Sequence, residues 1–198
     1  MCGRVRVGRS VIKSVQPARL SAAKQRTTER ADCSSDAECT GLLPWATLGL
    51  ERLDPWGKVI RYSASKELAK AGAVLTIGGS TSSATKQIYS SSRLTTTSGD
   101  VAVSVAVVAW SQGARNFGTS EAGTALPNGS TTNVDEQAND QGTAAGRPAG
   151  TGFVSRTPTS ATDARDKAGN PVGEFDDVVT WIPVGTLVAR MVQAGRLP

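Results

Sequence analysis

The chain has 198 residues, of which 38% are hydrophobic, and this is enough for one domain with a buried core. It contains no histidine, which excludes Ser-His-Asp and Cys-His catalytic groups and histidine-based zinc sites. The net charge of +5 is uneven, because residues 1–30 carry eight Lys or Arg and one acidic residue, whereas residues 31–198 carry fourteen and sixteen. We therefore predict a basic tail or helix remnant over residues 1–30 and a globular domain over residues 31–198.

The basic tail is interpreted as a solvated segment, with a nucleic-acid arm as the sharper alternative. No aromatic residue lies among its charges, so the base-stacking part of a single-strand binding site is missing, and we expect no nucleic-acid partner. The tail has no apolar run of the length that a secretion signal or a membrane span needs. Its composition from Val11 to Arg30 favours a helix, although Pro17 argues against one that is continuous from Val11.

Cys33 and Cys39 flank a short polar loop at the start of the globular domain. Two interpretations are open for this pair. The cysteines close a small disulfide ring, as an exported location would allow, or they remain free thiols that behave as small apolar side chains.

Residues 41–62 combine two Trp, two Pro and a run of Leu with turn-forming Gly. The Pro and Gly positions mark turns, and the residues between them are too apolar for a solvent loop. We predict a structural corner that lies over a core, with Trp45 and Trp56 as anchors and Asp54 and Gly57 in the turn.

A strand is predicted from Lys58 to Ala64, followed by a short turn or helix. Tyr62 and Lys66 in this region resemble the Tyr-x-x-x-Lys motif of short-chain dehydrogenases, in which the Tyr donates a proton and the Lys lowers its pKa. That motif requires a dinucleotide fold ahead of it, and only 61 residues precede Tyr62, without a strand that leads into a Gly-rich turn. This enzyme is kept only as a remote alternative, and we expect no catalytic residues.

The later part of the chain predicts further strands around one continuous apolar segment. Residues 101–110 are Val-rich and apolar on both faces, which predicts a central strand with cover on each side. Weaker strands are predicted at residues 87–97 (an edge strand), 153–156 and 175–182. The segment between residues 111 and 152 is rich in Gly, Asn, Ser, Thr and Ala, and it is interpreted as a long functional or variable loop.

The C-terminal segment predicts a short amphipathic helix from Val184 to Ala194. Its apolar residues follow helical spacing at Leu187, Val188, Met191 and Val192. Pro183 is expected to break the strand before it, and Gly195 is expected to stop it. Together these elements predict an α+β domain with an antiparallel sheet of about four or five strands.

Three stretches carry a resemblance to a family. The first contains Leu43, Pro44, Trp45, Thr47 and Leu48, then Asp54, Trp56, Gly57 and Arg61 to Ser63. The others are residues 105–118 and residues 174–198, which include Trp181. These stretches resemble the globular part of bacterial prepilin-like proteins, the type IV pilin and type II secretion pseudopilin group.

The resemblance implies a pilin-like sheet with an N-terminal helix remnant and a short C-terminal helix. It also implies a structural subunit of an envelope filament or secretion apparatus, in the periplasm or outside the cell. Its partners would be other pilin-like subunits and, through a missing N-terminal helix, the inner membrane. The expected structural residues are Cys33, Cys39, Trp45, Asp54, Trp56, Gly57 and Trp181. The alternative is a minor-pilin binding module, an adhesin or a DNA-contacting protein, that uses residues 111–152.

The N-terminus departs from the family pattern, because a prepilin leader and about twenty apolar residues are missing. Three explanations are open: a wrongly assigned gene start, a removed native N-terminus, or a relative that lost its anchor. We therefore expect either an exposed apolar sheet face or a substitute helix from residues 18–31 that covers it.

Two acidic clusters are candidate metal ligands, Asp135–Glu136 with Asp140, and Glu174 with Asp176–Asp177. The resemblance implies calcium as one possibility, because some secretion pseudopilins bind it through carboxylates and carbonyls in a C-terminal loop. The main expectation is instead solvated charges or a helix or strand terminus, since no regular calcium-loop spacing is present. We accordingly expect no metal and no cofactor.

Overall fold

The computed structural model describes residues 33–69, 84–160 and 173–196, and it confirms the predicted α+β class. Its strands are β1 (Thr40–Leu42), β2 (Arg61–Ala64), β3 (Lys86–Tyr89), β4 (Ala102–Ser111), β5 (Gly152–Val154) and β6 (Val178–Pro183). Its α-helices are α1 (Trp45–Leu48), α2 (Lys66–Ala69), α3 (Val134–Gln141) and α4 (Val184–Gln193), with a 3-10 turn, η2, at Ala144–Gly146. The predicted N-terminal helix remnant and the apolar run at residues 73–77 lie outside the described residues.

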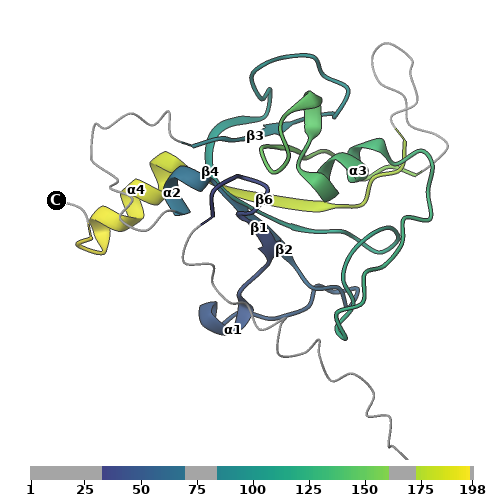
Figure 1. Cartoon of the computed structure of the whole chain (residues 1–198), viewed down its shortest axis with the longest axis horizontal. Helices are drawn as coiled ribbons and strands as arrows, with labels where there is room; N and C mark the ends of the chain where they lie inside the picture. Colours follow the sequence, from purple (N-terminus) through teal and green to yellow (C-terminus); the bar gives the residue numbers. More distant parts are fainter. Residues whose placement is uncertain (1–32, 70–83, 161–172, 197–198) are drawn as a thin grey trace, which may run out of the picture.

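The Val-rich strand β4 is the centre of the sheet (Figure 1). One of its sides pairs with β6 over Val105 to Ser111. The other side pairs first with β3 and then with β2, and these two strands carry β5 and β1 on their outer edges. The predicted central position of residues 101–110 is confirmed.

Strand β4 bends sharply where its partners change. Ser104 has a φ of +53°, which is unusual for a residue other than glycine, and the pairing registers with β3 and β6 both shift nearby. The bend turns β3 and β5 back over one face of β2, β4 and β6. As a result Phe153 of β5 packs against Trp110 of β4, with ring centroids 5.0 Å apart.

The sheet is mixed, and the prediction of a purely antiparallel sheet is wrong. Strands β3 and β5 are parallel, with Ile88 opposite Phe153. A parallel pair needs a long crossover connection, and the connection here contains β4 and α3. Because β3 lies between β4 and β5, the prediction of an edge strand at residues 87–97 is also wrong.

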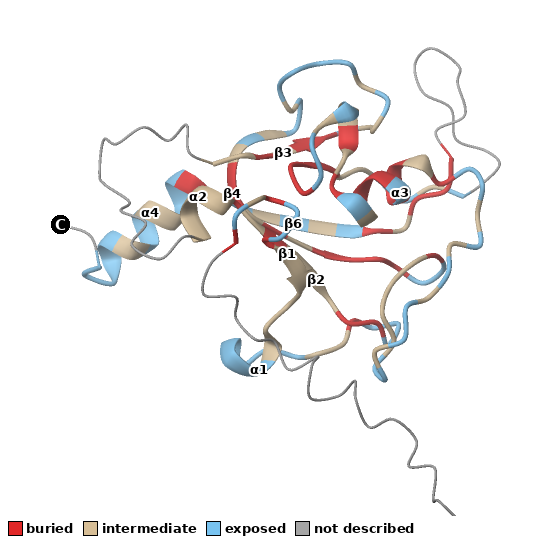
Figure 2. Cartoon of the chain, viewed as in Figure 1, coloured by how far each residue is buried: buried red, intermediate tan, exposed pale blue. Residues whose placement is uncertain are grey.

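The buried core lies between the curled sheet and α3. One cluster contains Ile88, Val105, Val108, Trp110 and Phe153, and partly buried Trp181 packs against it. A second cluster contains Tyr89 of β3, Ala138 of α3, Ala144 of η2, Val154 of β5, and Phe175 of the segment before β6. Figure 2 shows this distribution: most of β3 and much of α3 are buried, whereas β6 and most of β2 and α4 are half-buried or exposed.

The opposite face of the sheet has no cover in the part of the chain that the structure describes. Side chains alternate along a strand, and the paired registers place one set on this side. We call this surface the open face; it consists of Tyr62, Ala64, Val107, Ala109, Val178, Thr180 and Ile182, all half-buried or exposed. The expectation that β4 is covered on both faces is therefore wrong for the described residues.

The predicted corner is present, but polar groups hold it. Trp45 is half-buried in α1, whereas Trp56 is 46% exposed and does not reach the core. Buried Asp54 accepts hydrogen bonds from the backbone N–H groups of Trp56 and Lys58, each at 2.9 Å. Gly57 between them has a φ of +76°, in the left-handed region that suits glycine.

The C-terminal helix α4 confirms the predicted amphipathic helix. Pro183 ends β6 directly before it. Gly195, with a φ of +64°, ends it, and its N–H donates to the carbonyl of Val192 at 2.9 Å. Among the described residues, no helix has the length and apolar character needed to cross a membrane.

Candidate functional site

The structure brings one residue of the first predicted acidic cluster together with two residues of the second. Glu136 of α3 meets Asp176 and Asp177 of the segment that leads into β6, and one carboxylate oxygen from each lies within 4.8 Å of the others. We call these three residues the carboxylate cluster. The remaining acidic residues point elsewhere, because Asp140 pairs with Arg61 and Glu174 pairs with Arg115.

Helix α3 brings Glu136 into the cluster. The helix follows Asn133, its first turn contains Asp135 and Glu136, and it ends at Gly142, which has a φ of +65°. Negative side chains in a first turn are favoured by the helix dipole, so the expected helix terminus is confirmed for these two acids. The expectation of solvated charges is wrong for them, because each is only 1% exposed.

Glu136 is held by three donors. Its Oε2 accepts from the side-chain amides of Asn116 at 3.0 Å and Asn133 at 2.8 Å, and its Oε1 accepts from the backbone N–H of Asp176 at 2.9 Å. Burial raises the pKa of Glu136, and the neighbouring Asp176 charge raises it further, while these hydrogen bonds act in the opposite direction.

Asp177 is the most strongly perturbed acid. Burial raises its pKa well above 3.8, and the charges of Glu136 and Asp176 add to this shift. A hydrogen bond from Asn139 at 2.8 Å opposes the shift. Asp176 accepts from the backbone N–H of Ala114 through Oδ2, whereas its buried Oδ1 has no hydrogen-bond partner in the described part of the chain.

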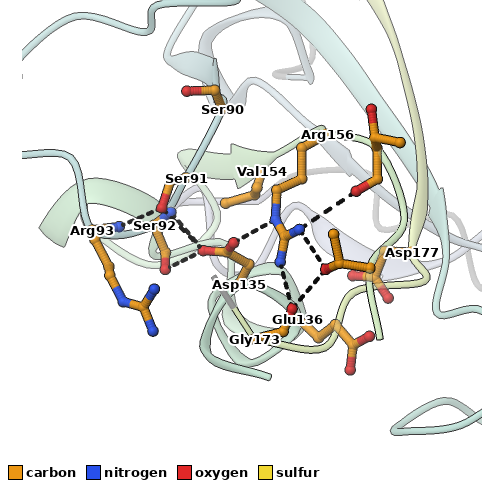
Figure 3. A network of polar contacts seen from close by, with 12 residues as sticks. Ser90, Ser91, Ser92, Arg93, Asp135, Glu136, Val154, Arg156, Gly173 and Asp177 are labelled. Atoms are coloured by element: carbon orange, nitrogen blue, oxygen red, sulfur yellow. Dashed lines mark hydrogen bonds and ion pairs between the residues drawn. The ribbon is translucent and has the colours of Figure 1, made fainter. Parts of the chain in front are cut away.

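An ion pair beside the cluster fixes the start of α3 (Figure 3). Arg156 donates from Nε to Asp135 at 2.7 Å and from Nη2 to the carbonyl of Gly173 at 3.2 Å. Asp135 also accepts from the backbone N–H of Ser92 at 2.8 Å. The guanidinium lies 4.5 Å from the ring centroid of Phe175. Arg156 therefore ties α3 to the segment before β6, and Asp135 ties it to the segment after β3.

The carboxylate cluster is suited to holding a positive charge. Oxygen ligands of this kind are those that Ca²⁺ prefers, and a shared proton would also relieve the repulsion between carboxylates. Comparison of the chain with models of protein families, with curated proteins and with solved structures finds no match. The absence of a metal and the absence of catalytic residues both stay predictions.

A second polar centre lies beneath a disulfide ring. Cys33 and Cys39 are disulfide-bonded, with their Cα atoms 5.3 Å apart, which confirms the first of the two interpretations. Asp36 lies within the ring, and its Oδ1 accepts from Lys86 Nζ at 2.7 Å and Thr85 Oγ1 at 2.5 Å. Lys86 is fully buried and also donates to the carbonyl of Gly150 at 2.5 Å.

The pKa shifts in this centre follow from burial and pairing. Burial acts to raise the pKa of Asp36, but the hydrogen bonds from Lys86 and Thr85 and the charge of Lys86 outweigh it, so that the pKa is lowered. Burial lowers the pKa of Lys86, and Asp36 only partly offsets this effect. The ring is thus connected to the sheet by a buried ion pair that the sequence analysis did not foresee.

The Tyr-x-x-x-Lys residues lie on two elements. Tyr62 is half-buried on the open face of β2, and Lys66 begins α2 and lies 3.8 Å from Glu67. A dehydrogenase would need a nucleotide fold ahead of this pair, and the described strand before β2 is β1 alone. Failure to bind a nicotinamide cofactor would remove this alternative.

Proposed function

We propose that the chain is the head domain of a structural subunit, a pilin or pseudopilin, in a bacterial envelope filament or secretion apparatus. The observation that carries the proposal is the open face of the sheet. In the proposed assembly a helix from the N-terminal part of such a subunit packs on this face and supplies the missing layer.

The composition of the open face supports this role. A sheet face that is exposed to solvent usually carries charged or strongly polar side chains. None of the open-face residues is charged, although Val178 is 55% exposed and Ile182 is 44% exposed. Covering each of these side chains would contribute about 1–2 kcal/mol, which favours contact with an apolar partner.

The disulfide ring supports an exported location. Disulfides persist in oxidising compartments and are rare in the bacterial cytosol. The Cys33–Cys39 bond closes a ring around Asp36, whose carboxylate contacts the buried Lys86. An envelope location is therefore part of the proposal.

The proposal is tested by cell fractionation. Cells of the source organism express the tagged chain, either as wild type or with Ile182→Asp, and are separated into cytosol, envelope and sheared filaments. A buried aspartate at the helix contact would be costly, so this variant should lose most of its association with sheared filaments or the envelope fraction. Wild type should remain in those fractions with Cys33 and Cys39 oxidised.

Leu50→Asp is the matched control, because Leu50 is 53% exposed and lies outside the open face. It should fractionate as wild type does. Urea unfolding of both purified variants should show small stability changes, since both positions are exposed in the isolated domain. Recovery of wild type from the cytosol with reduced thiols, or equal retention of the two variants, would contradict the proposal.

A further inference from the structure

A pocket of about 460 Å³ lies at the end of the sheet, away from the open face. Its floor is polar, with Arg61 of β2, Gln112 after β4, and Asp140 of α3. Its walls come from β1 and from the turn-rich segment after β4, and they include Leu42, Phe117, Ala125 and Leu126. This volume and mixture of apolar walls with a few polar groups are typical of a small-molecule site.

Contacts among Arg61, Gln112 and Asp140 hold the polar floor of the pocket in place. Asp140 Oδ1 accepts from Arg61 Nη1 at 2.5 Å and from Gln112 Nε2 at 2.9 Å. Arg61 also lies 4.9 Å from the ring centroid of Trp110, which fixes the plane of its guanidinium. The three side chains are therefore held in place before any ligand arrives.

The same contacts leave defined groups unused. Within the described chain, Asp140 Oδ2 and the Nε and Nη2 atoms of Arg61 have no hydrogen-bond partner. The side chains of Arg61 and Asp140 are 19% and 33% exposed, so a ligand can reach them. Gln112 is 3% exposed, and its Oε1 has no hydrogen-bond partner among the residues that the structure describes. The floor thus offers acceptors and donors next to one another.

The charge of the floor selects the ligand class. Arg61 and Asp140 cancel, so the pocket has no surplus charge for a phosphate or a metal ion. Neighbouring hydroxyl groups match the floor best, because each hydroxyl can donate to Asp140 and accept from Arg61.

Phe117 supports a ring-shaped ligand. Its φ of +51° is an outlier for an aromatic residue, and such strain is found at binding sites. Phe117 lines the pocket, and an aromatic side chain at this place can offer an apolar surface to the C–H face of a sugar ring.

We propose that this pocket binds one residue of a neutral carbohydrate. One hydroxyl donates to Asp140 Oδ2, a neighbouring hydroxyl oxygen accepts from Arg61, and the ring lies against Phe117. This site goes beyond the proposed structural function and does not depend on it, because a subunit that fails to assemble would still bind the sugar.

The test uses the whole purified chain and four probes: D-glucose, D-galactose, D-mannose and N-acetyl-D-glucosamine. Saturation-transfer NMR should detect binding of at least one of these sugars, with a Kd near the millimolar range. In the NMR spectrum of the protein, the bound sugar should shift the backbone amide signals of Gly118, Gly123 and Ala125. Asp140→Asn should weaken binding about tenfold, because it replaces the free acceptor with a donor. Ala125→Trp should abolish binding by filling the pocket.

Glu121→Gln is the matched control, because it removes one nearby negative charge from an exposed residue that does not line the pocket. It should bind as wild type does. Lack of any amide shift at the pocket with all four sugars would overturn the proposal, as would equal binding by Asp140→Asn. Shifts caused by a neutral tripeptide such as trialanine, with none from the sugars, would assign the pocket to peptides instead.

Discussion

Two buried polar centres in the described part of the chain balance their charge differently. Asp36 and Lys86 form a matched pair between the disulfide ring and β3, with a carbonyl as the third partner. The carboxylate cluster brings Glu136, Asp176 and Asp177 together, and the buried Asp177 has a raised pKa. The first centre therefore depends on keeping both charges, whereas the second is stabilised by losing one.

The largest expected change in stability comes from breaking the buried Asp36–Lys86 ion pair. Lys86→Met should lower the free energy of unfolding by about 3–5 kcal/mol, because it leaves a buried aspartate without its cation. Urea unfolding near neutral pH measures this change.

Lys66→Met provides the control for that substitution. Lys66 is 36% exposed and pairs only loosely with Glu67, so its loss should change stability by less than about 0.5 kcal/mol. If the two variants lost similar amounts of stability, the prediction that burial makes the Lys86 ion pair essential would be wrong.

An intermediate effect is expected from the ring. The double substitution Cys33→Ser with Cys39→Ser should destabilise the protein by about 2 kcal/mol, the value for closing a loop of this size. The ring also positions Asp36, so combining this change with Lys86→Met should cost less than the sum of the two. A double-mutant cycle by urea unfolding gives the coupling, and strict additivity would contradict the proposed connection.

The smallest effect is expected in the carboxylate cluster, with the opposite sign. Asp177→Asn should stabilise the protein at neutral pH by about 1 kcal/mol, because it removes a buried negative charge and keeps an oxygen for Asn139. Because its pKa is raised in the folded state, Asp177 contributes most to the free energy of unfolding below its unfolded-state pKa of 3.8. This contribution is lost as the pH rises through the folded-state pKa.

The pH dependence separates the two centres. The advantage of Asp177→Asn over wild type should therefore grow from about pH 4 to pH 7. Asp36 has a lowered pKa, so its stabilisation is present above 3.8 and is lost as the pH falls through the folded pKa. The penalty of Asp36→Asn should accordingly shrink under acid conditions. Parallel urea-unfolding profiles for the two variants would contradict this assignment.

Local sequence patterns predicted much of the fold. The Val-rich run gave β4 its central position, and the helical spacing of Leu187, Val188 and Met191 gave α4. Both signals are strong because each element has a continuous apolar pattern of its own. Helix α3 was missed, since its buried residues include Asp135, Glu136 and Asn139, and no apolar periodicity marks it. The acidic first turn and Gly142 after its last residue were the available signals.

The functional residues were harder to predict because distant segments assemble them. Glu136 and Asp176 are forty residues apart, and they meet only because the segment before β6 lies against the start of α3. No sequence pattern marks Lys86 as buried, because its partner Asp36 lies fifty residues away within the disulfide ring. The Arg61–Asp140 contact spans an even longer separation, 79 residues, and defines a pocket that no motif marks.

The pairing of β4 has a consequence for the time course of folding. Strand β4 ends at Ser111, but its longest partner, β6, ends at Pro183. At a synthesis rate of 5–20 residues per second, roughly 4 to 14 s pass between the completion of the two strands. During that interval a Val-rich edge has no partner, and such edges attract other chains. Pairing with β6 therefore closes this edge of β4 only after that interval, and until then the edge is open to pairing with another chain.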